Sequence, residues 1–231
     1  MDQDQASPRA QAVRWLDTVA AWCGPLAVIL VVVAGTLYAP SAAGASPTMT
    51  GTALVSAFAQ NISAAPASAV AYLLAATSML AFAGALFDHL RRGQVTHWPA
   101  FLAAGGALAT AIELTEYARI TLASVVAVNN GDAVTAGVVT TLSWEAARLF
   151  AAGAVAMMAG AGVAGLRGAL PRWLTVLSLL GAGGVLAASV AAAVPDTVVA
   201  AAPAGLLALL GLLWTFPAAV VMTRRNRHGG R

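Results

Sequence analysis

The chain has 231 residues, of which 60% are apolar and only 9% are charged. Soluble domains carry roughly 25% charged residues, so this composition excludes an ordinary soluble protein and indicates a membrane protein. All 12 basic residues are arginines, and the absence of lysine excludes a retinal or pyridoxal Schiff base. The formal charge of +3 is typical of a membrane chain whose arginines set its orientation, and it does not indicate nucleic-acid binding. A single cysteine, Cys23, excludes an internal disulfide and a cysteine-based zinc site.

Six apolar runs follow a polar N-terminal segment, residues 1–17. Each run reaches or exceeds the roughly 20 residues that a helix needs to cross about 30 Å of hydrocarbon. The first run is a full span rather than the shorter core of a signal peptide, so we expect it to be retained. The sequence predicts an all-α membrane protein, a bundle of six transmembrane helices forming one domain over residues 18–222, with a basic tail at 223–231. The predicted spans cover about 18–39, 66–87, 99–128, 138–166, 173–194 and 197–222.

The arginines outside the spans fall in alternate connections. They are Arg9 and Arg14, Arg91 and Arg92, Arg167 and Arg172, and the C-terminal cluster. By the positive-inside rule these segments, and therefore both termini, are cytoplasmic. Each odd-numbered span also begins with an arginine or histidine followed by tryptophan, which anchors a helix end at the headgroup level. The chain is therefore predicted to form three helical hairpins that enter from the cytoplasm.

The longest polar connection, residues 40–65, is expected on the outer side. A short helix is predicted within it, over about residues 50–63, from four apolar residues at helical spacing: Leu54, Val55, Phe58 and Ile62. Such a helix either lies on the membrane surface as an amphipathic element or is an ordinary ordered loop helix. Farther along, Asn129-Asn-Gly-Asp132 predicts a turn between the third and fourth spans.

Five charges lie inside the third and fourth apolar runs, where charges are costly unless they are paired. They are Glu113, Glu116, Arg119, Glu145 and Arg148. Spacings of three residues place each set on one side of its helix, and the two sets most simply face each other inside the bundle. We place the cytoplasmic ends of the third and fourth spans near residues 99 and 165. Because the two helices are antiparallel, the numbers of two residues at equal depth, one on each helix, then sum to about 264. This register predicts two cross-helix ion pairs, Glu116–Arg148 and Arg119–Glu145.

The same register leaves Glu113 opposite Ala151, without a basic partner at its own level. One alternative is that the ion pairs fix the register of the hairpin, while Glu113 is protonated or hydrogen-bonded to Thr110 or Tyr117. The other is an outward-facing polar cavity that binds an ion, a proton or a small polar ligand, with Glu113 as its titrating group. The candidate binding residues are therefore the five charges together with Tyr117.

Two function classes follow from these alternatives. The first is a small transport or ligand-sensing protein that uses the cluster, and the second is a non-catalytic accessory or assembly subunit in which the cluster is structural. An enzyme is less favoured, because no nucleophile or metal set accompanies the carboxylates. We expect no cofactor and no metal site, since His89 and His97 flank one loop without a third ligand at metal-site spacing. The predicted partner is the lipid bilayer, while a protein partner or a homo-oligomer stays open.

Parts of the chain resemble a known group of sequences. They are the stretch from Gly51 to Asn61, Ala71-Tyr-Leu-Leu with Phe82 and Leu86 before Leu90-Arg-Arg92, and Ala169-Leu-Pro-Arg-Trp-Leu174 leading into a glycine-bearing apolar span. Together they resemble a broad group of uncharacterised six-span membrane proteins of high-G+C Gram-positive bacteria, of the domain-of-unknown-function kind. The resemblance implies a bacterial plasma-membrane location and no particular activity. The glutamate and arginine cluster is not part of the resemblance.

Overall fold

The computed structural model describes residues 8–38, 49, 51–92, 96–192 and 212–228. Every regular element within them is a helix, which confirms the all-α class. Four helical segments of these residues are long and apolar enough to cross a membrane: Trp15–Leu37, Ile62–Arg91, Ala133–Leu166 and Arg172–Val190. The helices are α1 (Pro8–Leu37), α2 (Thr52–Ala59), the short 3₁₀ helix η1 (Ile62–Ala64), α3 (Ala65–Arg91), α4 (Trp98–Asn130), α5 (Ala133–Leu166), α6 (Arg172–Ala192) and α8 (Thr215–His228).

Helix ends differ from the predicted boundaries mainly at the two termini. The first helix begins at Pro8, so much of the segment expected to be a polar extension is helical, and proline is well suited to a first helical turn. The last helix continues through Arg224 to His228, so part of the predicted basic tail at 223–231 is helical. Most of the sixth predicted span, residues 197–222, lies outside the described residues, as does the connection that precedes it.

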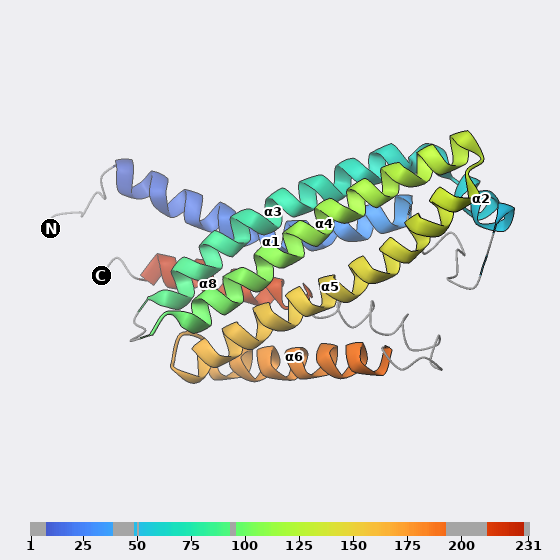
Figure 1. Cartoon of the computed structure of the whole chain (residues 1–231). Coiled ribbons are helices and arrows are strands. Elements are labelled where there is room, and N and C mark those ends of the chain that lie inside the picture. The colour runs from blue at the N-terminus through green and yellow to red at the C-terminus, as the bar shows by residue number, and fades with distance from the viewer. Residues whose placement is uncertain (1–7, 39–48, 50, 93–95, 193–211, 229–231) are drawn as a thin grey trace, which may run out of the picture.

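The helix α4 is as long as its neighbours but is not among the four apolar segments. Its apolar run is interrupted by Glu113, Glu116 and Arg119. It nevertheless lies between α3 and α5 and packs along both of them (Figure 1). Among the other helices, α1 packs on α3, α6 packs on α5, and α8 packs on α1, so the first and last described helices are in contact.

Glycine brings α4 and α5 into backbone contact. A Cβ atom added at Gly106 would lie 2.2 Å from the Met157 amide nitrogen, and one at Gly160 would lie 2.4 Å from the Ala103 nitrogen. A Cβ added at Gly153 would meet the Thr110 hydroxyl at 2.8 Å. Small residues permit this approach where lipid supplies no hydrophobic drive for helix association. The contacts of Gly153 with Thr110 and of Gly160 with Ala103 confirm the register counted from the sequence.

The far end of the α4–α5 hairpin is closed by the predicted turn. Gly131 adopts the left-handed conformation (φ 61°) that ends α4, a position suited to glycine. Asp132 then caps α5 by accepting hydrogen bonds from the amides of Val134 and Thr135. The side-chain hydrogen bond from Thr135, followed by these amides, holds the pKa of Asp132 below its usual value. The turn predicted from Asn129-Asn-Gly-Asp132 is confirmed.

The short helix α2 covers this end of the hairpin. Its buried side chains, Leu54 and Phe58, form a small core with Ile120 of α4 and Val139 of α5. The predicted loop helix is therefore confirmed, and its apolar side faces protein rather than lipid. An ordered loop helix is the alternative that these contacts favour.

Candidate functional site

The six candidate residues lie within about two turns of α4 and one turn of α5, in the same part of the hairpin, but the five charges do not face each other. Arg119 of α4 binds Glu116 of the same helix, with the guanidinium 2.9 Å from the carboxylate. Arg148 of α5 binds Glu145 of its own helix at 2.8 Å. The predicted cross-helix pairs, Glu116–Arg148 and Arg119–Glu145, are therefore wrong. The arginine side chains are 73% and 56% exposed on the outside of the helix pair.

Helix geometry explains why the predicted register of α4 against α5 was right although the charges do not face each other as predicted. Residues three apart are neighbours on the same helix, so each arginine finds a glutamate without leaving its own helix. At 3.6 residues per turn, Arg119 points about 180° away from Thr110, and Arg148 points about 140° away from Gly153. Thr110 and Gly153 are in contact, so they mark the sides on which α4 and α5 meet. The glycine positions, rather than the charges, carried the sequence signal for the interface.

Tyr117 is the candidate that does lie between the helices. Its ring stacks on Tyr72 of α3, with centroids 5.5 Å apart, and meets the edge of Phe150 of α5 at 6.5 Å. Such aromatic pairs add to the stability gained from burial alone. Tyr117 thus links α3, α4 and α5 at the level of the charges. It acts there as part of the packing, which the sequence did not predict.

Glu113 lies about one turn nearer to Trp98 than Glu116 does, and it flanks the contact between α4 and α5. It is half-buried and forms no ion pair with another described residue. Its orientation, about 60° from Thr110, accounts for this intermediate burial. The expectation that Glu113 lacks a basic partner agrees with the described part of the chain.

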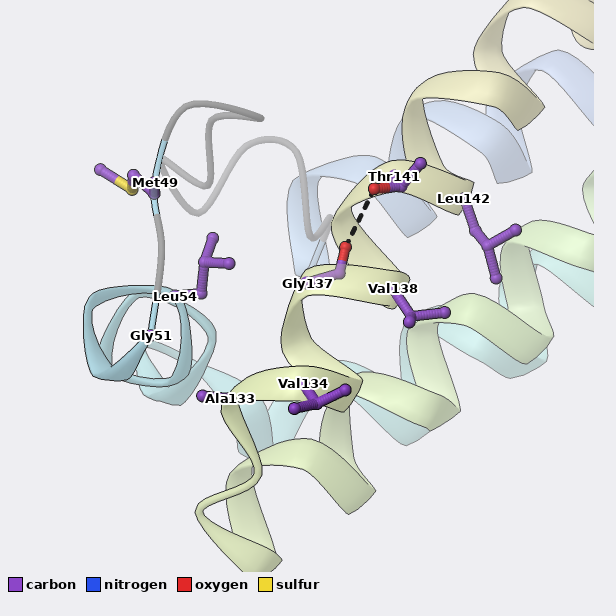
Figure 2. A pocket seen from close by; sticks show the side chains of 9 residues that line it. All are labelled: Met49, Gly51, Leu54, Ala133, Val134, Gly137, Val138, Thr141 and Leu142. Atoms are coloured by element: carbon purple, nitrogen blue, oxygen red, sulfur yellow. Dashed lines mark hydrogen bonds between the residues drawn. The ribbon is translucent and has the colours of Figure 1, made fainter.

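A groove lies beside α2, at the turn end of the α4–α5 hairpin. It has a volume of about 470 Å³ and runs between Met49, Gly51 and Leu54 on one side and the first three turns of α5 on the other. Figure 2 shows Val134, Val138 and Leu142 along one side of α5, with the Thr141 hydroxyl bonded to the Gly137 carbonyl. Its lining is almost wholly apolar and includes none of the six candidate residues. This groove was not anticipated from the sequence.

A smaller, polar cavity of about 140 Å³ lies at the opposite end of the bundle, between α1, α3 and α8. Asp17, Asp88 and Arg92 line it, and Arg92 bridges Asp88 of its own helix and Asp17 of α1, the latter at 3.8 Å. Asp88 also accepts a bond from Arg91 at 2.9 Å. The charges here are mutually neutralised. Within the described residues, no three histidine, cysteine, aspartate or glutamate side chains come together as a metal site would require.

A double-mutant cycle tests the new pairing. We expect the coupling free energy between Glu116 and Arg148 to be close to zero, because each already binds a residue of its own helix. Glu145 and Arg148 should couple by about 0.3–0.5 kcal/mol, the usual value for an exposed pair within one helix. The measurement is the unfolding free energy in detergent of the alanine single and double variants. A coupling above about 1 kcal/mol between Glu116 and Arg148 would restore the cross-helix pair.

Comparison of the chain with protein-family models, with curated proteins and with solved structures found no match.

Proposed function

We propose that this chain is a non-catalytic accessory or assembly subunit of a bacterial plasma membrane, which binds a membrane helix of a partner along the outer part of α5. It crosses the membrane six times, with α4 as one of the spans and with both termini in the cytoplasm. The observation that carries this proposal is the outward exposure of the charged and apolar residues of α5. A polar cavity for transport would instead hold those charges inside the bundle.

The position of the two ion pairs supports a membrane boundary at their level. Arg167 lies over the Trp98 ring at 5.5 Å, which sets a common level for the near ends of α4 and α5. Glu116 and Arg148 lie about 27–29 Å from that level at 1.5 Å per residue. This matches the thickness of the hydrocarbon core, about 30 Å. Charges exposed on the outside of a bundle are tolerated at the headgroup level and costly deeper in the membrane.

The remaining residues of α4 and α5 then extend beyond the membrane, and α5 carries an apolar stripe there. Val134, Val138, Leu142 and Leu149 are all largely exposed, with Val134 at 78%. Their spacing places Val134, Val138 and Leu142 on one side of the helix, beside the apolar groove. An exposed apolar surface outside lipid indicates an interaction site.

A membrane helix is the partner that fits this stripe. Leu149 lies on the membrane side of Arg148, whereas Val134 and Val138 lie on the outer side. An occupant that covers the whole stripe must therefore leave the membrane alongside α5 and continue outward. The exposed Glu145–Arg148 pair at the boundary offers both signs of charge to such a helix.

Glu113 supports a second candidate, a proton-coupled or ion-binding role. A half-buried carboxylate without an ion pair among the described residues is unusual in an apolar helix. Glu113→Gln removes the charge while keeping the shape of the side chain. Under the accessory role this variant should leave partner binding unchanged. Loss of a pH-dependent ion-binding signal in Glu113→Gln would favour transport instead.

Photo-crosslinking in intact cells tests the partner surface. A photoreactive phenylalanine analogue at Val138 should give one discrete protein adduct, identified by mass spectrometry as a second copy or another membrane protein. The matched control at Val176, an equally exposed residue of α6, should give lipid adducts only. Leu142→Asp should abolish the protein adduct without changing expression. Lipid adducts alone at Val138, or a protein adduct that survives Leu142→Asp, would contradict the proposal.

A further inference from the structure

A third groove lies at the arginine-bearing end of the bundle, between the α5–α6 connection and α8. Its volume is about 460 Å³, within the range of about 300–1,000 Å³ usual for small-molecule sites. Leu170, Pro171 and Trp173 line one side, and Val220, Val221 and Arg224 line the other. The groove therefore joins an apolar surface to a guanidinium group. That combination fits a ligand with an apolar body and an anionic head.

Positive charge is concentrated around this groove. Arg224 is an exposed residue of its lining, and Arg172 lies between two other lining residues, Pro171 and Trp173. Arg172 is exposed and forms no ion pair with any described residue. By contrast, Arg91 and Arg92 at the same end both bind Asp88. Arg172 is thus distinguished from Arg91 and Arg92, whose charge is balanced by Asp88.

The groove also lies at the depth of lipid headgroups. Trp173 is 55% exposed at the first turn of α6, which is one of the four apolar segments. Exposed tryptophan at the start of a spanning helix is typical of the membrane interface. The indole of Trp214 donates a hydrogen bond of 2.7 Å to Ser178, which places Trp214 about one and a half turns above the start of α6. Val220 and Val221 therefore return to the level of Trp173.

We propose that this groove binds one anionic phospholipid of the cytoplasmic leaflet. The headgroup phosphate pairs with Arg224 and Arg172, since a guanidinium can bind phosphate oxygens with two parallel hydrogen bonds. One acyl chain lies against Leu170, Val220 and Val221, and the Trp173 ring lies beside the glycerol region. Basic grooves at the cytoplasmic ends of transmembrane helices are suited to such headgroups. The lipid groove and the partner-binding surface lie at opposite ends of the bundle, so either can fail while the other stands.

Native mass spectrometry of the full chain tests this site. The protein is released from micelles that contain phosphatidylcholine in excess and a minor share of phosphatidylglycerol. We expect one phosphatidylglycerol to be retained per chain in preference to phosphatidylcholine. Arg224→Gln should reduce this preference about fivefold, the effect of losing one arginine near an anionic headgroup. Arg224→Lys should keep most of it, because the positive charge remains.

Two further variants separate a built site from general attraction to charge. Val221→Trp fills the apolar part of the groove and should abolish retention although every arginine is present. Arg92→Gln is the matched control, since Arg92 binds Asp88 and does not line this groove. Thermal unfolding in neutral detergent identifies any variant that is misfolded. If Arg224→Gln is misfolded, Arg172→Gln replaces it as the test of the charge. Equal loss in Arg92→Gln and Arg224→Gln, displacement of the lipid by inorganic phosphate, or no preference over phosphatidylcholine would each overturn the proposal.

Discussion

Gly106→Ala is expected to lower the unfolding free energy by about 3 kcal/mol, the upper part of the usual range for overpacking. A Cβ atom at this position would lie 2.2 Å from the Met157 nitrogen and 2.6 Å from the Gly153 carbonyl oxygen. Both are backbone atoms, so a side-chain rotation cannot relieve the clash and α4 and α5 must separate. The measurement is chemical or thermal unfolding of the purified protein in detergent.

The adjacent Gly105 provides the control. An added Cβ there meets no atom within 4 Å, and alanine is favoured over glycine in a helix by about 1 kcal/mol. Gly105→Ala should therefore be neutral or stabilising. Gly160→Ala should resemble Gly106→Ala, and the two should not add fully because they open the same interface. Equal effects at Gly105 and Gly106 would show that α4 and α5 do not meet as described.

Trp214→Ala is expected to cost about 3–5 kcal/mol, as for other large buried side chains. Trp214 is almost fully buried, and its indole nitrogen donates to the Ser178 hydroxyl, which in turn donates to the Leu174 carbonyl. This chain of bonds joins the segment before α8 to α6. Unfolding in detergent, followed by tryptophan fluorescence and circular dichroism, measures the loss.

The hydrogen bond itself is tested by a smaller pair of variants. Ser178→Ala leaves the buried indole N–H without its acceptor and should cost about 1–3 kcal/mol. Trp214→Phe removes the donor, so adding Ser178→Ala to it should cost much less than Ser178→Ala alone. Strictly additive effects would indicate that Trp214 and Ser178 do not interact.

The sequence was sufficient for the class of fold and for most helix boundaries, because long apolar runs have one stable conformation in a membrane. It was also sufficient for the register of α4 against α5. Counting residues from the two ends of the hairpin needs only the helical rise. The turn at Asn129-Asn-Gly-Asp132 likewise depends on local chemistry, with Gly131 in the left-handed conformation and Asp132 as the cap.

The orientation of each helix about its own axis was not predictable from the charges. Glu116 and Arg119 satisfy each other within α4, so they impose no direction toward α5. The contact side is set by Gly106, Gly153 and Gly160, where the lack of a side chain lets the two backbones approach. Grooves such as the one beside Val138 depend on how α2 folds back over the hairpin, and no local pattern encodes that arrangement.

We propose that the charged residues of α4 and α5 mark the outer membrane boundary and that the hairpin extends beyond it. Labelling of single cysteines in intact cells with a membrane-impermeant maleimide tests this most directly, after Cys23→Ser removes the native thiol. Cysteine at Val138 should be labelled from outside, cysteine at Gly105 should resist labelling, and cysteine at Arg91 should react only in permeabilised cells. Protection of the cysteine at Val138 to the same degree as that at Gly105, or labelling of the cysteine at Arg91 from outside, would contradict this membrane placement.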